Sequence, residues 1–118
     1  MRTFVYNITN KKLNSMLIFN TTYLVSDKAH GSWLKWIREQ HIPFMLDSTY
    51  FSQPQVARVI TSAEQEGTSF SVQFKVNDMR TLKKWNQEYS AIFQENCSQQ
   101  FGSEVIFFTT VLELIDND

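Results

Sequence analysis

Alternation of apolar and polar side chains predicts two strands, each with one packed face and one polar face. Residues 17–25 are rich in β-branched and aromatic side chains, and Asn20 and Thr22 fall on the opposite side from the apolar positions. Within residues 68–76, Phe or Val stands at every second position from residue 70 onward, with Ser, Gln or Lys between them. We therefore expect both segments to turn one face toward a core.

Two further segments predict the remaining strands of the sheet. Residues 50–61 form one of them, and the polar segment 62–67 joins it to residues 68–76 as a hairpin loop would. Pro54 interrupts this strand, and because proline has no amide hydrogen, it indicates a sheet edge or a bulge. Residues 105–114 are apolar on both sides, so we expect both faces of the last strand to be covered.

Apolar residues at three-to-four spacing predict a first helix, which Ser26 or Asp27 can cap. Its packing stripe consists of Trp33, Ile37, His41 and Phe44, with Leu34 alongside. Because the residue before a proline avoids helical geometry, Pro43 is expected to end this helix near Gln40 or His41. Residues 43–48 would then form a short turn before the next strand.

The same spacing predicts a second helix between the third and fourth strands. Asn77 or Asp78 can cap it, and Gly102 is a plausible break after it. The expected packing stripe consists of Leu82, Trp85, Tyr89, Ile92 and Phe93.

The resulting order β-α-β-β-α-β predicts an α+β protein of the ferredoxin-like class, a four-stranded antiparallel sheet with two helices on one face. Two helices cover only one face of such a sheet. Since the last strand is apolar on its second face as well, we expect that face to be buried against another subunit. The sequence thus predicts a homodimer, associated as in a dimeric α+β barrel.

Composition narrows the classes of function. The chain has 118 residues, of which 42% are hydrophobic, which is enough for one core in one domain. Its net charge is −1 and its basic residues never run longer than two, so we expect no nucleic-acid partner. No stretch approaches eighteen consecutive apolar residues, so we expect no membrane span.

Cysteine and histidine usage predicts neither a disulfide nor a metal centre. Cys97 is the single cysteine and the two histidines are not clustered, so we expect no metal and no cofactor, and a reducing, cytoplasmic location. Residues 1–15 mix apolar and polar side chains, and we interpret them as an N-terminal extension, disordered or preceding the true start, ahead of a domain spanning residues 16–118. An ordered extra strand is the alternative.

Five residues are candidates for ligand binding, and each has an alternative structural role. His41 near a helix end could act as a base or bind a ligand near neutral pH, or it could hydrogen-bond to the turn and fix the helix exit. Trp36 lies at the edge of its stripe, where it could border a cleft or an interface. Arg58 interrupts an apolar strand, where it could bind an anionic ligand. Alternatively, it could form an ion pair or be solvated at the edge of the sheet. Asn20 and Gln73 project from the polar sheet face, where they could contact a ligand or form an amide network across the dimer.

A resemblance to a known family agrees with this fold. The segments that carry it are 16–22, Trp33-Leu34-Lys35-Trp36, His41-Ile42-Pro43, 70–74, Phe101-Gly102, Phe108-Thr109-Thr110 and Leu112-Glu113. Through them the chain resembles a bacterial family of small proteins, domain of unknown function 4286, and it departs from that family's pattern at Gly31-Ser32. The resemblance implies a ferredoxin-like fold and a start at Met16, and it implies no activity.

Two hypotheses of function follow. The first is a non-enzymatic dimeric module that binds a small molecule or a protein partner on the polar sheet face, with Asn20, His41, Arg58 and Gln73 as contacts. The second is an enzyme like the cofactor-independent monooxygenases, in which a cavity holds an aromatic substrate and His41 moves a proton. Fold analogy alone supports the second hypothesis.

Overall fold

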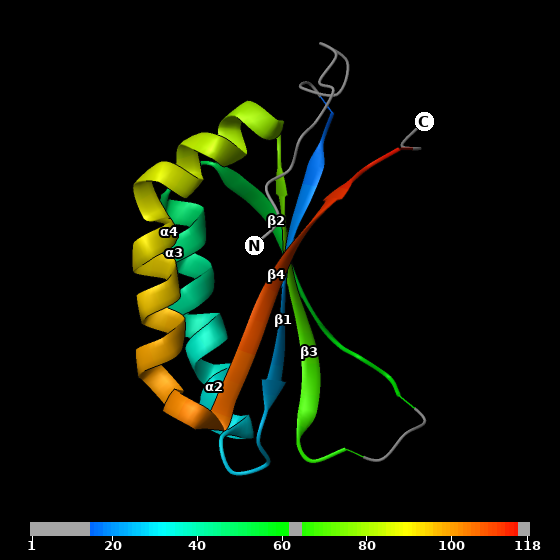
Figure 1. Ribbon diagram of the computed structural model, residues 1–118, viewed down its shortest axis with the longest axis vertical. Coiled ribbons are helices and arrows are strands. Elements are labelled where there is room, and N and C mark those ends of the chain that lie inside the picture. The colour runs from blue at the N-terminus through cyan, green and yellow to red at the C-terminus, as the bar shows by residue number, and fades with distance from the viewer. Residues whose placement is uncertain (1–14, 62–64, 116–118) are drawn as a thin grey trace.

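Four antiparallel strands form one sheet in the computed structural model, which describes residues 15–61 and 65–115 (Figure 1). The strands are β1 (Leu17–Val25), β2 (Phe51–Arg58), β3 (Thr68–Val76) and β4 (Val105–Glu113). Their order across the sheet is β2-β3-β1-β4, so the two central strands are the first and third along the chain. This is the ferredoxin-like arrangement, and the predicted fold class is confirmed. The expected N-terminal extension lies outside the described residues, apart from Ser15.

All the helices lie on one side of this sheet (Figure 1). The first helical segment contains α2 (His30–Trp36), the π-helix η1 (Ile37–His41) and α3 (Ile42–Asp47). The second contains α4 (Met79–Phe101) and ends in the 3-10 turn η2 (Gly102–Glu104). Within the described residues, no helix combines the length and the apolar character needed to cross a membrane.

The expected turn at residues 43–48 is wrong, because the helix continues through Pro43 to Asp47. The amide of Ile42 donates to the carbonyl of Ile37, five residues earlier, as in a π-helix. A proline inside an α-helix lacks one donor and clashes with the carbonyl four residues before it. Here the wider π turn comes directly before Pro43, which stands in the first turn of α3, where a proline is tolerated.

Pro54 lies at a β-bulge on an edge strand, as its position in the sequence indicates. Ser52 pairs with Lys75 and Gln55 pairs with Gln73, so two residues of β2 stand opposite one residue of β3. One of the two, Gln53, has a positive φ of 51°. The bulge therefore bends the strand at one end of the sheet.

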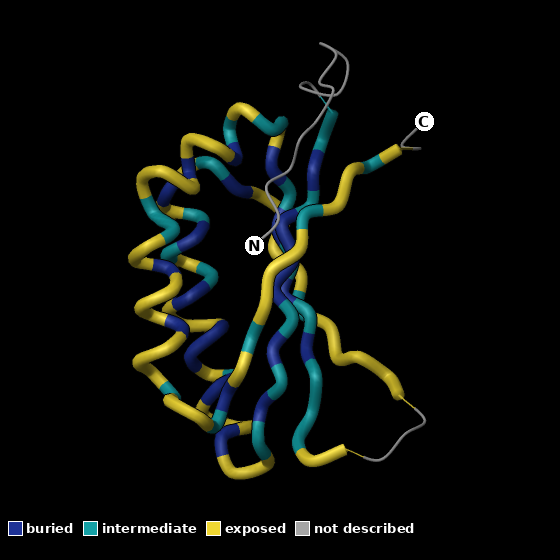
Figure 2. Tube along the Cα trace, viewed as in Figure 1, coloured by how far each residue is buried: buried dark blue, intermediate teal, exposed yellow. Residues whose placement is uncertain are grey.

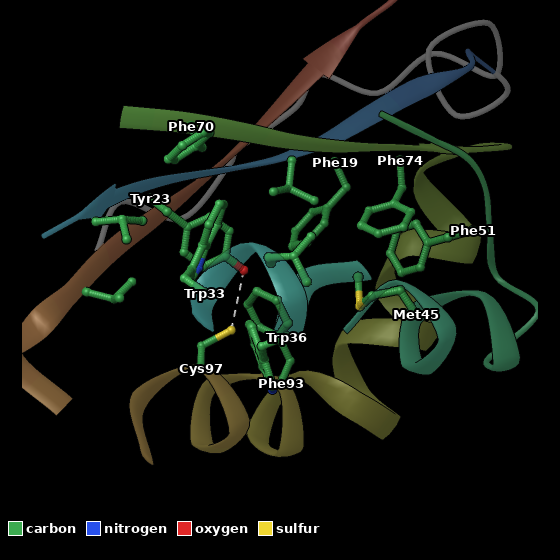
Figure 3. Close-up of a cluster of buried hydrophobic side chains, with 14 of the residues drawn as sticks. Phe19, Tyr23, Trp33, Trp36, Met45, Phe51, Phe70, Phe74, Phe93 and Cys97 are labelled. Atoms are coloured by element: carbon green, nitrogen blue, oxygen red, sulfur yellow. Dashed lines mark hydrogen bonds between the residues drawn. The ribbon is translucent and has the colours of Figure 1, made fainter. Parts of the chain in front are cut away.

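Aromatic rings fill the space between the sheet and the helices (Figure 3). Phe19 of β1 lies 5.1 Å from Trp85 of α4, and Trp33 of α2 lies 4.7 Å from Phe70 of β3, measured between ring centroids. Both tryptophans are buried, as expected for core residues. The hydroxyl of Tyr23 contacts the sulfur of Cys97 at 3.5 Å (Figure 3). Burial raises the pKa of the Cys97 thiol to about 11, so this thiol is protonated at neutral pH.

The packing stripe of α4 differs from the prediction at two positions. Ile92 is 47% exposed, whereas Cys97, which the sequence did not place on the stripe, is buried together with Leu82, Trp85 and Phe93. At about 100° of rotation per residue, Ile92 lies about 80° from Leu82 around the helix, at the border of the buried face.

Asp78 caps α4, and its removal is expected to destabilise the protein modestly. One carboxylate oxygen accepts hydrogen bonds from the amide and the hydroxyl of Thr81, each at 2.8 Å, and these bonds lower the pKa of Asp78. We expect Asp78→Ala to reduce the free energy of unfolding in urea at pH 7 by about 1 kcal/mol. The control is Asp47→Ala, at an exposed helix end, with an expected change within about 0.5 kcal/mol. Equal losses in both variants would contradict this role of the cap.

Candidate functional site

The sheet face turned away from the helices is the candidate functional site, and we call it the open face. Alternate residues of β1 and β3 that point to the helices are buried, whereas those that point away are in most cases half-buried. Figure 2 shows much of β4 and the distal part of β2 as exposed, on either side of the better-buried central strands. The cross-strand register places Asn20 and Gln73 next to each other on this face, as the sequence predicted.

A hydrogen-bonded network centred on Asn20 occupies the middle of the open face. The Asn20 side-chain amide donates to the hydroxyls of Thr22, at 3.2 Å, and Thr110, at 3.1 Å. Its carbonyl oxygen accepts from the hydroxyl of Ser71, which in turn accepts from the Gln73 amide at 3.2 Å. Asn20 is only 8% exposed although none of the described helices covers this face. The network therefore holds three strands together through side chains.

The network leaves defined hydrogen-bonding capacity for a ligand. Both amide hydrogens of Asn20 already form hydrogen bonds within the protein, so Asn20 has no hydrogen left to donate to a ligand. The Thr22 and Thr110 hydroxyls accept from Asn20 and keep their own hydrogens to donate. Gln73 uses one amide hydrogen and keeps its carbonyl oxygen. Of the two amides predicted as contacts, Gln73 is thus the one with free capacity.

An apolar strip lies beside this network on β4. Ile106 and Phe108 are each 60% exposed, and Leu112 is 45% exposed. The register places them opposite Leu24, Thr22 and Ile18 of β1. These side chains form the second apolar face that the sequence indicated for the last strand. No element in the described part of the chain covers them.

A depression of about 320 Å³ lies where the β2 bulge meets the open face. The polar side chains that line it are Gln53, Gln55, Gln73 and Lys75, and the remaining lining residues are Ile18, Pro54 and Phe74. β-Bulges often occur beside functional sites because they re-aim side chains. The sequence indicated the bulge but not the depression, which depends on the pairing of Gln55 with Gln73.

His41 and Trp36 lie on the other side of the sheet, within the helical layer. The two rings stack with centroids 5.1 Å apart and an angle of 23° between their planes. His41 is 2% exposed and Trp36 is 7% exposed. Desolvation lowers the pKa of His41 from 6.5 to about 4, so its imidazole is neutral at physiological pH. The structure therefore does not bring His41 together with Asn20 and Gln73.

Arg58 ends β2 at the sheet edge and is exposed. It pairs with Phe70 across the ladder, so the register places it on the helix-facing side of the sheet. Its charge is solvated at this position. Of the five candidate residues, only Asn20 and Gln73 share the open face, and Thr110 of β4 joins them. The expected register of the last strand could have revealed Thr110, because it stands directly opposite Asn20.

Acidic and metal-ligating side chains do not gather at this site. Within residues 15–61 and 65–115, no group of three or more His, Cys, Asp or Glu is placed to hold a metal ion.

Comparison with solved structures supports the fold. One similar structure is a Bacillus cereus protein described as a "putative antibiotic biosynthesis monooxygenase", with 11% identity, a TM-score of 0.61, and coverage of 88% of this chain and 97% of that one. Another is a Bacteroides thetaiotaomicron protein described as a conserved protein of unknown function and "possible oxidoreductase", with 14% identity, a TM-score of 0.56, and coverage of 86% and 99%. At these identities the likeness shows a shared fold and no shared activity.

The sequence comparisons agree with the resemblance noted above. No curated protein matches this chain. The model of the family described as Domain of unknown function (DUF4286) matches residues 16–115, and the protein belongs to this family.

Proposed function

We propose that the protein is a homodimeric binding module whose two open faces pack together and hold a small molecule at their polar edge. One observation carries this proposal: Ile106, Phe108 and Leu112 are 45–60% exposed on a sheet face that no helix of residues 15–61 and 65–115 covers. Complete burial of a fully exposed side chain of this size contributes about 1.5–3 kcal/mol, and about half of that is still to be gained by each of these three. A second copy of the same sheet is the occupant that the composition of this face favours.

The near absence of charge on the open face supports this occupant. Among the strand residues that the register places on this face, Lys75 is the single charged side chain. Charged residues are depleted at the cores of protein interfaces, whereas an ordinary surface carries many of them. The outer side of α4, by comparison, exposes Arg80, Lys83 and Lys84.

The area of the open face reaches the lower limit for a specific interface. With four strands, of which β1 has nine residues, the face measures roughly 19 by 30 Å, or about 570 Å². Two faces in contact would bury on the order of 1,100 Å², above the roughly 1,000 Å² that a specific interface needs. A two-fold dimer is also self-complementary, so the apolar strip of one copy can meet that of the other.

The depression at the β2 bulge is the proposed ligand site of the dimer. It combines three carboxamides, from Gln53, Gln55 and Gln73, with the ammonium group of Lys75. Carboxamides donate and accept hydrogen bonds, and the ammonium group favours a negative charge. The ligand class is therefore a small polar molecule that carries one carboxylate or a similar anionic group.

The fold likeness to a protein described as a "putative antibiotic biosynthesis monooxygenase" gives weaker support to the enzyme hypothesis. A substrate cavity between helices and sheet would need space that the aromatic core occupies, from Tyr23 and Trp33 at one end to Phe51 at the other (Figure 3). His41, the proposed base, contacts Trp36 and Phe93 there. The open face therefore supports the binding module better.

Native mass spectrometry of the protein as purified tests both halves of this proposal. We expect a mass of twice 13.9 kDa plus a small bound molecule. Gln73→Leu removes a carboxamide from the depression, so we expect the added mass to be lost while the dimer remains. The matched control is Gln87→Leu, at an exposed position of α4, which should retain the added mass. A bare dimer would contradict the ligand site, and a monomer would contradict the dimer.

A further inference from the structure

A groove of about 300 Å³ lies between the first helical segment and α4, and we call it the His41 groove. Its floor consists of Trp36, His41 and Phe44. Four carboxamide side chains surround them: Gln40, Asn96, Gln99 and Gln100. Because the groove belongs to the helical layer, it is separate from the open sheet face (Figure 1).

The imidazole of His41 is an unsatisfied polar group at the floor of this groove. Its Nε2 atom is enclosed by protein and has no hydrogen-bond partner. An enclosed polar atom without a partner is costly, and such atoms in native proteins call for an explanation. The ring as a whole is 2% exposed, so His41 contributes to the floor of the groove, and the exposed carboxamides supply the groups that a ligand would reach first.

The backbone beneath the groove is also unusual. His41 is the last residue of the π-helix Ile37–His41, and the groove includes Gln40 from the same turn. π-Helical turns within α-helices are frequent at functional sites. The π turn brings His41 against Trp36 while the chain continues past Pro43.

The groove offers hydrogen-bonding groups that the protein itself does not use. Within the described chain, none of the four carboxamides makes a hydrogen bond to another residue. None of the residues that line the groove carries a charge at neutral pH, since burial keeps His41 neutral. Carboxamides present donors and acceptors side by side, which matches the polar edge of an uncharged heterocycle.

We propose that the His41 groove binds a small, uncharged nitrogen heterocycle of one or two fused rings. The aromatic floor packs against the flat ring, and the carboxamides pair with its nitrogen and oxygen atoms. The volume of the groove limits the ligand to one or two rings, because about 300 Å³ is at the lower end of the range for small-molecule sites. The proposal does not depend on the dimer, since the groove is built within one chain.

Two-dimensional NMR with three neutral probes, adenine, indazole and quinazolin-4-one, tests this proposal. We expect at least one probe to shift the side-chain amide signals of Gln40, Asn96, Gln99 and Gln100 and the indole signal of Trp36. A double variant, Gln99→Leu with Gln100→Leu, should raise the Kd at least tenfold, which corresponds to the loss of about one hydrogen bond. The control is Gln94→Leu on the same helix, an exposed carboxamide outside the groove, which should leave the Kd unchanged.

Three outcomes would overturn the proposal. The first is the absence of shifts at the groove with all three probes up to their solubility limits. The second is an equal rise in Kd for the double variant and for Gln94→Leu. The third is a set of shifts confined to the open face, around Gln73. Binding to a Phe108→Glu variant should match binding to the wild type, which separates this site from the proposed dimer.

Discussion

Replacing Phe108 with Glu should raise the dissociation constant of the dimer at least 100-fold. Phe108 is 60% exposed on the open face, opposite Thr22 of the neighbouring strand. A two-fold dimer buries this ring twice, and because 60% of the ring is exposed in the single chain, each copy gains about 1–2 kcal/mol. The variant loses both contributions and would bury two carboxylates instead, which adds a further cost. A loss of 3 kcal/mol or more corresponds to a factor above 100 in Kd.

Sedimentation velocity over a concentration series measures this change. The wild type is expected to sediment as a dimer at micromolar concentration and Phe108→Glu as a monomer. Because Phe108 contacts solvent in the single chain, the variant should keep its fold, which circular dichroism can check. The control is Ile92→Glu, which places the same charge at an apolar side chain 47% exposed on α4. A wild-type monomer, or a dimer unaffected by Phe108→Glu, would contradict the proposed interface.

The dimer prediction rests on strands that could be predicted from the positions of apolar side chains along the sequence. The bounds of β1 and β3 match the expected strands at residues 17–25 and 68–76. The large apolar side chains at alternate positions, such as Phe19 and Tyr23, fixed the packed faces, since a slip of one residue would turn these side chains outward. The second apolar face of the last strand was visible for the opposite reason, because residues 105–114 are apolar on both sides. The sequence predicts two helices, which cover one face of the sheet, so apolar side chains on the other face of the last strand can be recognised as lacking a covering element.

The helix through Pro43 could not be predicted in this manner. Rules for proline assume the α-helical ladder, in which residue 43 would meet the carbonyl of Glu39. A π turn changes the ladder by one residue, and propensity carries no strong signal for such turns. The buried contacts of His41 with Trp36 and Phe93 are tertiary, so they form only once the helices pack.

The candidate site was partly visible in the sequence. Asn20 and Gln73 share the open face because they stand opposite each other at non-packing positions of neighbouring strands. His41, by contrast, belongs to the packing stripe of its helix together with Trp33 and Ile37. A packing stripe faces the sheet from the helical side, so none of its members can reach the open face. The position of His41 on the packing stripe of its helix is therefore enough to predict that it lies on the other side of the sheet from Asn20 and Gln73.

Burial of His41 should make the protein less stable as the pH falls from about 6.5 to 4. The pKa of His41 is about 4 in the folded protein, against 6.5 when the chain is unfolded. Above pH 6.5 neither form binds the proton, so His41 adds no pH dependence. Between the two values only the unfolded chain binds it, and the free energy of unfolding falls by about 1.4 kcal/mol for each pH unit. The loss reaches about 3 kcal/mol at pH 4 and does not increase below it.

Urea unfolding of the wild type and His41→Leu between pH 4 and pH 8 isolates this contribution. Leucine is close to histidine in volume and leaves no unsatisfied nitrogen, so the variant is expected to fold and to gain on the wild type by about 3 kcal/mol between pH 7 and pH 4. Titration of the carboxylates affects both proteins equally and cancels in the difference. Gln40→Leu places the same side chain one residue earlier and keeps the imidazole, so it should follow the wild-type curve. If the difference between the wild type and His41→Leu stayed constant across this range, His41 would not be held neutral by burial.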